Sequence, residues 1–234
     1  MKNLKKVMIL SGAGLSAESG LKTFRDSGGL WENYDVMEIC SATGFARNPS
    51  KVLAFYDERR VQLKSVLPNH AHKVIAQLKS EFKEQICIIT QNVDDLLERA
   101  GCESVIHLHG FLPELYCASC GYKENIGYTK QKSTLCPKCS QNALRHNIVM
   151  FEEPAPEYAT LYGALDETDL FVCIGTSGYV LPVGHFARAC PHSILNNLEA
   201  DESLDGYFEK CYTMKASLAI DKIAADIREF LGKR

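Results

Sequence analysis

Four short apolar segments, each followed by a polar or glycine-containing loop, constrain the fold of this chain more than any other feature. They are Val7–Leu10 before SGAG, Ile86–Thr90 before QNVD, Leu170–Ile174 before GTSG, and Ser193–Leu195 before NNLEAD. Short apolar runs separated by helical patterns are typical of a parallel sheet covered by helices on both faces. Ligands of such sheets bind beyond the carboxyl ends of the strands, where these loops fall. We therefore expect an α/β fold with a Rossmann-like sheet, covered in part by a helix over Ser217–Leu231.

Composition narrows the class of protein further. The 234 residues carry a formal net charge of -3 and a pI near 6.2, which gives no bulk attraction for nucleic acids or membranes. The basic start Met1–Lys6 precedes an apolar run that is too short for a signal peptide or a membrane span. The ten cysteines therefore point to a reducing compartment, where regular spacing indicates metal binding or catalysis. We expect a cytoplasmic monomer without nucleic-acid or membrane partners.

The first loop has the pattern of a nucleotide-binding turn. Gly12-x-Gly14-x-x-Ala17 follows a predicted strand and begins a predicted helix, and its small residues allow backbone amides to approach a pyrophosphate. A purely structural turn is the alternative. An ordinary dinucleotide fold would continue to a second strand, but Thr23–Trp31 is glycine-rich, polar and aromatic. Such a segment suits a loop that closes over a ligand.

Two Cys-x-x-Cys motifs predict a metal site. Cys117, Cys120, Cys136 and Cys139 form two pairs with 15 residues between them. Four thiolates at this spacing suit tetrahedral Zn²⁺, and a site without an open coordination position is structural. A redox-active pair is the alternative, but it would need only one of the motifs.

Several motifs in a fixed order resemble one known family. They are GAGLSAESGLKTFRDSGGLW, TQNVDDLLERAG, HLHG, the paired Cys-x-x-Cys motifs, GTS and NLE. From about Val7 to Ala216 the chain resembles the sirtuins, the NAD-dependent protein-lysine deacylases. The resemblance implies NAD as cofactor, a structural Zn²⁺ and acylated lysine side chains of proteins as substrates. It also implies release of nicotinamide and O-acyl-ADP-ribose.

The resemblance also implies a set of cofactor-binding residues at the strand ends. They are Gly12, Ala13, Gly14, Ser16, Thr23, Phe24, Arg25, Trp31, Gln91, Asn92, Asp94, Gly175, Thr176, Ser177, Asn197, Leu198, Glu199 and Ala216. Phe24 would shield the reacting ribose, whereas core filling explains Trp31 equally well. Asn92 is also expected to be catalytic. Helix capping remains the alternative for the Gln-Asn-Val-Asp segment, and turn chemistry for the two later segments.

The histidines of the HLHG motif are expected to have different roles. His107 and His109 alternate, so in an extended segment they point the same way. A shared metal site is a weak alternative, because no carboxylate is suitably spaced. An imidazole can accept a proton near neutral pH. By resemblance His109 is the catalytic general base that deprotonates a ribose hydroxyl, and His107 is structural.

A helix is expected after Asn48 and Pro49, which fit the N-cap and the first helical position. One stripe of that helix carries Val52, Tyr56, Arg59 and Leu63. An arginine within an apolar stripe needs an anionic partner, unless its head reaches solvent or a nearby carboxylate. The next residue, Arg60, is expected to point elsewhere and to be solvated.

Tyr56-x-x-Arg59 coincides with a pair found in the sirtuin branch that removes succinyl, malonyl and glutaryl groups. The resemblance implies that Arg59 binds the acyl carboxylate, that Tyr56 adds a hydroxyl donor, and that Cys40 leaves room at the pocket floor. We therefore expect removal of succinyl, malonyl and acetyl groups. One departure concerns the peptide-binding strand over 149–153, where Glu152 replaces the glycine of the usual Phe-Gly-Glu.

We expect a single catalytic domain over residues 1–234. Its Rossmann-like part would cover about 1–33, 74–113 and 146–234. A small module would combine a helical segment at about 34–73 with a zinc ribbon at about 114–145. Three other functions remain open: a deacetylase without acidic-acyl preference, a mono-ADP-ribosyltransferase and a non-catalytic NAD-sensing module.

Overall fold

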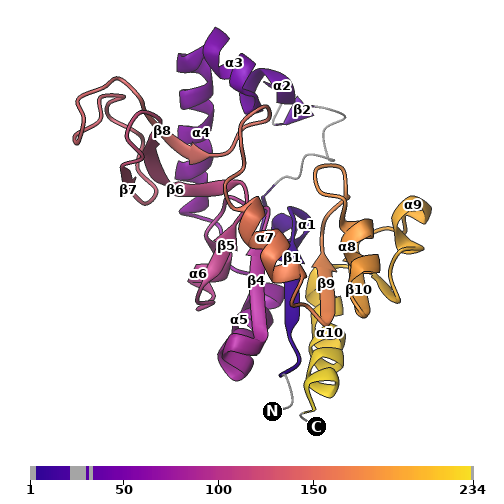
Figure 1. The fold of residues 1–234 in the computed structure, drawn as a ribbon. Coiled ribbons are helices and arrows are strands. Elements are labelled where there is room, and N and C mark those ends of the chain that lie inside the picture. The colour runs from indigo at the N-terminus through magenta and orange to yellow at the C-terminus, as the bar shows by residue number, and fades with distance from the viewer. Residues whose placement is uncertain (1–3, 22–29, 32–33, 233–234) are drawn as a thin grey trace.

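The computed structural model describes residues 4–21, 30–31 and 34–232, and its centre is a six-stranded sheet of order β11-β10-β9-β1-β4-β5 (Figure 1). Neighbouring strands pair in parallel throughout. The strands are β1 (Val7–Ser11), β4 (Ile86–Thr90), β5 (Val105–His107), β9 (Leu170–Ile174), β10 (His192–Asn197) and β11 (Lys210–Thr213). The prediction of a Rossmann-like parallel sheet is confirmed, including the four strands read from the apolar runs.

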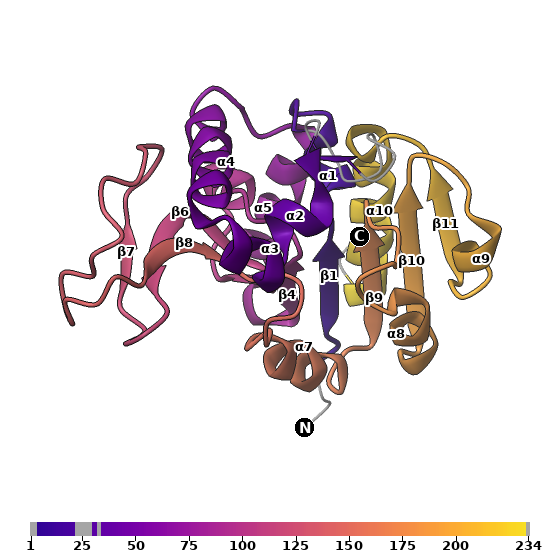
Figure 2. The same cartoon turned by 90° about the horizontal axis from the view of Figure 1, so that it is seen from above.

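Helices cover both faces of this sheet (Figure 2), and the side chains of β1 alternate between the two faces. Val7 and Ile9 join the apolar cluster under α5 (His70–Phe82) and α10 (Ala216–Leu231), while Met8 and Leu10 join the cluster on the opposite face. That opposite face is covered by α7 (Tyr158–Leu165) and α8 (Val183–Ala189). Burial on both faces explains why the central strands are continuously apolar rather than alternating. The predicted C-terminal helix is confirmed as α10.

A smaller group of elements lies beside the sheet, at the upper left of Figure 1. It contains the antiparallel strands β6 (Gly110–Cys117), β7 (Lys123–Asn125) and β8 (Leu144–Ile148), and the helices α2 (Val36–Cys40), α3 (Ala42–Arg47) and α4 (Pro49–Leu63). Ile39, Phe55 and Ile148 belong to an apolar cluster that joins these helices to β6 and β8. Helix α4 begins as predicted: Asn48 accepts a hydrogen bond from the amide of Lys51, and Pro49 occupies the first turn.

The remaining elements are short. They are α1 (Gly14–Ala17), β2 (Leu30–Trp31), β3 (Tyr34–Asp35), a 3₁₀ turn (Lys83–Gln85), α6 (Leu96–Arg99) and α9 (Glu202–Asp205). None of the helices within the described ranges is long and apolar enough to cross a bilayer. All ten cysteines are free thiols.

Arg60 corrects a prediction from the sequence. Its side chain is fully buried instead of solvated. Nε donates to the carbonyl of Leu112 at 2.7 Å and Nη2 donates to that of Glu114 at 3.0 Å, while Asp57 lies 3.4 Å from Nη1. Burial lowers the pKa of Arg60 to about 10, against the charge of Asp57, which raises it. Position on the helix alone predicted exposure, but β6 supplies carbonyl acceptors that keep this guanidinium inside and tie α4 to the antiparallel sheet.

Candidate functional site

The nucleotide loop after β1 is locked against the turn after β9 by three glycines. Gly12 and Gly14 donate backbone hydrogen bonds to the carbonyls of Ile174 and Gly175, each at 2.9 Å. A Cβ on either residue would lie 2.7 Å from an atom of Gly175, closer than real contacts allow. Gly175 itself has a φ of +66°. Glycine is therefore required at all three positions, because the two backbones touch.

Ser16 forms the centre of a buried hydrogen-bond network. Its hydroxyl donates to Asp94 at 2.9 Å, accepts from the side-chain amide of Asn92 at 3.1 Å and lies 3.3 Å from Nε2 of His72. The amide of Asn69 donates to Nδ1 of His72, so Nε2 is the protonated nitrogen. Burial lowers the pKa of His72 to about 4 and raises that of Asp94 to about 6. The network thus pairs a neutral imidazole with a carboxyl group that titrates near neutrality.

His109 lies just beyond β5 and has the surroundings of a neutral base. Its Nδ1 is 3.1 Å from the carbonyl of Gln91, so this nitrogen carries the proton. Its Nε2 is 3.1 Å from the hydroxyl of Tyr158, which is able to donate. Burial lowers the pKa of His109, while the bond to Gln91 opposes that shift. The ring is therefore neutral at physiological pH, with a lone pair on Nε2.

The later strand ends complete this edge of the sheet. Gln91 donates from its side chain to the hydroxyl of Thr176 at 3.0 Å, which joins the ends of β4 and β9. At the end of β10, Asn197 is buried, and its side-chain nitrogen has no hydrogen-bond partner among the described residues. Leu198 is exposed, and Ala216 begins α10. The carboxyl ends of the strands therefore offer a ligand the side-chain amide of Asn197 as a donor and the exposed side chain of Leu198 as an apolar surface.

The two residues predicted for acyl recognition both lie on α4. Tyr56 is buried, and its hydroxyl donates to the thiol of Cys40 at 3.4 Å. Burial raises the pKa of Tyr56 well above its usual value and that of Cys40 to about 11, so both groups are neutral. Arg59 is partly buried, and its guanidinium lies 5.3 Å from the ring centre of Phe55. The structure thus brings Tyr56 and Cys40 into contact and places a cation one turn farther along the helix.

Glu152 occupies backbone geometry that favours glycine. Its φ is +73°, and its carboxylate accepts hydrogen bonds from the amide and the hydroxyl of Thr43 at 2.9 and 2.7 Å. The preceding residue, Phe151, forms a parallel bridge: its amide donates to the carbonyl of Cys40 and its carbonyl accepts from Ala42. The segment 149–153 is therefore attached to the start of α3, and the Glu152 side chain strengthens that attachment.

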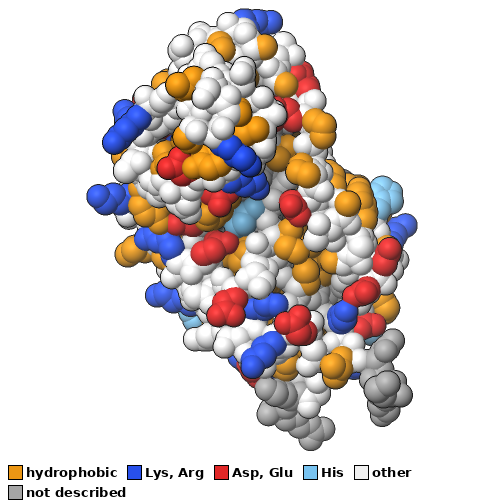
Figure 3. Space-filling model, turned by 60° about the vertical axis from the view of Figure 1, so that its left-hand side comes forward, with side chains coloured by type: hydrophobic (Ala, Val, Ile, Leu, Met, Phe, Trp, Pro, Cys, Tyr) orange, Lys and Arg blue, Asp and Glu red, His pale blue; other side chains and the backbone are white. Residues whose placement is uncertain are grey.

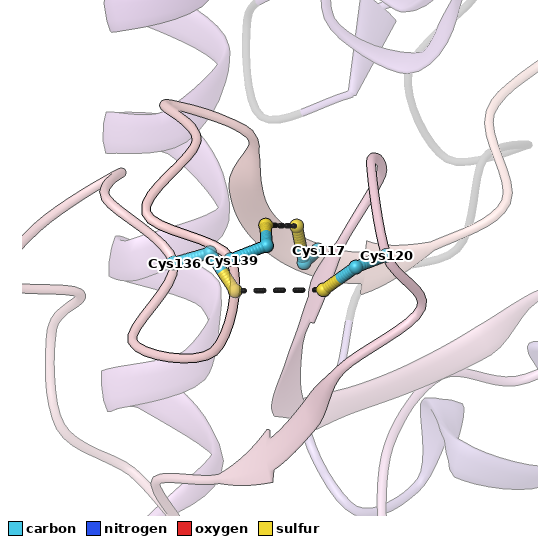
Figure 4. A group of neighbouring side chains, drawn as sticks. All are labelled: Cys117, Cys120, Cys136 and Cys139. Carbon is cyan, nitrogen blue, oxygen red and sulfur yellow. Dashed lines mark hydrogen bonds between the residues drawn. The ribbon is translucent and has the colours of Figure 1, made fainter.

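The four cysteines of the paired motifs come together as predicted (Figure 4). Their sulfur atoms all lie within 4.8 Å of one another, and the Cys117–Cys139 and Cys120–Cys136 distances are both 3.7 Å. Sulfurs placed tetrahedrally at about 2.3 Å from Zn²⁺ would be about 3.8 Å apart. The geometry therefore fits a closed, structural zinc site, and two separate disulfides are not formed.

Comparison with known proteins identifies the family. A family model described as the Sir2 family matches residues 12–182. The chain belongs to the Sir2 family. A relative from Campylobacter jejuni (strain RM1221), named NAD-dependent protein deacylase, is 64% identical over 97% of this chain and 98% of its own length. A mutant Sir2 homologue solved with ADP-ribose matches with a TM-score of 0.86 and 32% identity, over 98% of this chain and 94% of that one. A Sir2 homologue in complex with NAD matches with a TM-score of 0.83 and 33% identity, over 97% and 91%.

The Sir2 family resemblance drawn from the sequence is thereby confirmed, and the residues present fit a dinucleotide. The glycine turn, the buried donor of Asn197 and the Ser16 network lie at the carboxyl ends of neighbouring parallel strands. Thr23, Phe24 and Arg25 lie outside the described residues. The backbone of Trp31 is described in β2, but its side chain is not.

Two residues at this Sir2-type site were missed in the sequence. Tyr158 begins α7 and contacts His109, and Glu98 on α6 binds Nε2 of His107 at 2.7 Å. Nothing in the local pattern distinguishes Tyr158, because its partner is far away in the chain. Glu98 had a weak signal: it follows the QNVD motif by one helical turn, on the same strand–loop–helix unit.

Proposed function

We propose that this protein is an NAD-dependent protein-lysine deacylase. The observation that carries the proposal is His109, a neutral imidazole held by the carbonyl of Gln91 at the end of β4 in a Sir2-family chain. The proposed reaction consumes NAD, an acylated lysine and one water molecule, and yields nicotinamide, lysine and O-acyl-ADP-ribose. The name of the Campylobacter relative and the cofactors in the solved Sir2 homologues support this assignment.

Different residues would bind the two ends of NAD and accept the proton. Backbone amides around Gly12, Ala13 and Gly14 would face the pyrophosphate, where a helix N-terminus favours negative charge. Asn92 and Asp94 would hold the nicotinamide end, since both are already fixed by Ser16. As nicotinamide leaves, the acyl oxygen would attack the ribose carbon, and His109 would then take a proton from a ribose hydroxyl.

Product analysis tests this function directly. The purified, zinc-loaded protein is mixed with NAD and acetylated or succinylated peptides, and the products are identified by mass spectrometry. We expect free nicotinamide, deacylated peptide and O-acyl-ADP-ribose. ADP-ribose attached to protein would instead indicate a transferase. NAD binding without nicotinamide release would indicate a sensing module.

We further propose that acidic acyl groups are preferred, with acetyl also removed. Tyr56 and Arg59 project from successive turns of α4, and the small Cys40 lies against the Tyr56 hydroxyl. A guanidinium bonded to a carboxylate stabilises a complex by about 1.5–3 kcal/mol, which is about a 10- to 100-fold preference.

Arg59→Met tests the preference, because methionine keeps much of the apolar stem and removes the charge. We expect kcat/KM for a succinylated peptide to fall about 10- to 100-fold while that for the acetylated peptide changes little. Arg47→Met, at the exposed end of α3, is the matched control. If the ratio of succinyl to acetyl activity is the same in Arg59→Met as in the parent, the pocket assignment is wrong.

The setting is also proposed: the protein acts as a monomer in the cytoplasm on acylated proteins, without nucleic acid. Its ten free thiols and the near-neutral charge support this setting. Light scattering of the purified protein, with and without NAD, would measure the molar mass; a dimer mass would refute the monomer.

A further inference from the structure

Two histidines hold consecutive carbonyl groups of the loop after β4. Nδ1 of His109 lies 3.1 Å from the carbonyl of Gln91, and Nδ1 of His107 lies 2.9 Å from the carbonyl of Asn92. Both rings therefore donate to the loop from the side of β5. His107 comes from the last residue of that strand, so its position is set by the sheet.

The second nitrogens of the two rings face opposite kinds of group. Nε2 of His109 meets the hydroxyl of Tyr158, which satisfies a neutral imidazole. Nε2 of His107 meets the carboxylate of Glu98 at 2.7 Å, while its Nδ1 already faces a carbonyl. A ring between two acceptors needs two N–H groups. The geometry therefore requires an imidazolium at His107.

The surroundings of His107 maintain that charge. The side chain is 11% exposed, and the ring of Phe111 packs against it with centroids 4.8 Å apart. Burial lowers the pKa of His107, but the hydrogen bond and charge of Glu98, with smaller contributions from Asn92 and Asp94, raise it overall. The other charged groups around the adjoining hollow of about 560 Å³ are Glu114, Lys123 and Glu157. Figure 3 shows this side of the molecule, where acidic and basic side chains surround a hollow between the small and large parts.

Asn92 is the residue that this arrangement fixes. Its backbone amide donates to the hydroxyl of Thr90 at 3.0 Å, its side-chain amide donates to Ser16 at 3.1 Å, and its carbonyl accepts from His107. Of these three restraints, only the bond from His107 is strengthened by a full charge. Its loss would weaken the restraint on the peptide between Asn92 and Val93 and leave the bonds to Thr90 and Ser16 to hold the residue.

We propose that Glu98 and the His107 imidazolium form a positioning pair that holds Asn92 in its NAD-binding geometry, an inference that rests on the proposed function. The pair does not touch the proton-accepting nitrogen of His109. Its removal should therefore weaken the use of NAD much more than it slows the chemical step.

Glu98→Gln tests the pair, because glutamine keeps an acceptor of the same length and removes the charge. We expect KM for NAD to rise about five- to tenfold, with kcat and KM for the peptide changed less than about twofold. Glu103→Gln, an exposed neighbour on the same side, is the control. Thermal unfolding of both variants shows whether Glu98→Gln alters the fold instead.

Nitrogen-15 NMR of histidine-labelled protein supplies a readout that does not depend on turnover. We expect both ring nitrogens of His107 to be protonated at about pH 7.5 in the parent, and one of them to lose its proton in Glu98→Gln. A neutral His107 in the parent would overturn the proposal, and so would an unchanged KM for NAD in Glu98→Gln. If the parent consumed no NAD, the proposed function would fail, while NAD calorimetry and the ring spectrum would still decide on the pair.

Discussion

Asp94 belongs to the hydrogen-bond network of Ser16, and its burial lowers the stability of the folded chain. Its side chain is 8% exposed and accepts hydrogen bonds from Ser16 and from the amide of Leu96. Burial nevertheless raises its pKa to about 6, because these bonds do not replace the lost hydration. The carboxyl group of Asp94 is therefore harder to ionise in the folded chain than in the unfolded chain. Above about pH 6 the ionised Asp94 therefore lowers the free energy of unfolding. This destabilisation decreases as the pH falls toward 4.

Asp94→Asn should be more stable and less active than the parent. We expect the free energy of unfolding to rise by about 1–2 kcal/mol at about pH 8, and the gain to shrink at about pH 5. Urea titrations of the parent and the variant at the two pH values measure the free energy of unfolding. The exposed Asp166→Asn should show neither effect. A lower stability of Asp94→Asn at both pH values would contradict this account of the buried charge.

His109 predicts the acid limit of activity. The base must be neutral, and burial places its pKa below the ordinary histidine value. We therefore expect kcat/KM for an acylated peptide to be level at neutral pH and to fall only below the ordinary histidine pKa of about 6.5. The measurement is a pH–rate profile of nicotinamide release. An acid limb centred well above pH 7 would show that His109 is protonated more easily than its surroundings imply.

Residues differ in how much of their role the sequence reveals. The zinc cysteines were predicted because spacing alone brings their thiols together, and the Asn48 cap because its partner is three residues away. Arg60 was predicted wrongly, since its acceptors belong to a strand far along the chain. Tyr158 was missed for the same reason, since it lies 49 residues from His109, whereas Glu98 is only nine residues from His107 and its local signal was overlooked. Local chemistry is readable in the sequence, whereas contacts made by tertiary folding are not.

At the scale of the element, the segment 149–153 contains one of the four non-glycine residues with a positive φ in the described part of the chain. A left-handed residue other than glycine is strained, and at Glu152 two hydrogen bonds to Thr43 offset that strain. In the same segment the amide of Phe151 donates to the carbonyl of Cys40, whose thiol contacts the hydroxyl of Tyr56. The backbone thus connects Glu152 directly with the proposed acyl pocket.

Replacing Glu152 in two ways separates the strain from the bonds. Glu152→Ala keeps the strained φ and removes both bonds, whereas Glu152→Gly removes the bonds and the strain together. We expect the alanine variant to unfold at a lower temperature than the parent and the glycine variant to lie between them. Differential scanning calorimetry provides the comparison. Equal melting of the two variants would mean that the positive φ costs nothing.

At the scale of the whole molecule, the antiparallel ribbon has a core of its own. Leu115, Cys117, Cys136 and Leu144 form an apolar cluster separate from those that cover the parallel sheet. We propose that the small module, expected at about 34–73 and 114–145, comprises α2–α4 and β6–β8. Its first boundary would then lie between α4 and α5, because position 73 falls inside α5. The large sheet was predictable because its strands are continuously apolar. The short edge strand β5 was not, because it has only three half-buried residues.

Zinc removal should therefore act on the small module first. A structural Zn²⁺ contributes on the order of 10 kcal/mol to the folding of a small ribbon. We expect a chelator to increase amide exchange in β6–β8 while β1, β4 and β9 stay protected, and nicotinamide release to be lost. Cys136→Ser should lose its metal, whereas the exposed Cys211→Ser should retain about one zinc per chain by elemental analysis. Equal loss of protection in both sheets would contradict separate cores.

The contact among Gly12, Gly14 and Gly175 also has a consequence in time. The ribosome makes the first two glycines early, but the third follows directly after β9, so their contact forms only when β9 has been synthesised and has paired with β1. A nascent chain that ends before β9 consequently lacks one wall of the nucleotide cradle. Cofactor capture must therefore await synthesis beyond Gly175, about three quarters of the 234 residues, so a chain that ends earlier should not sequester NAD in the cell.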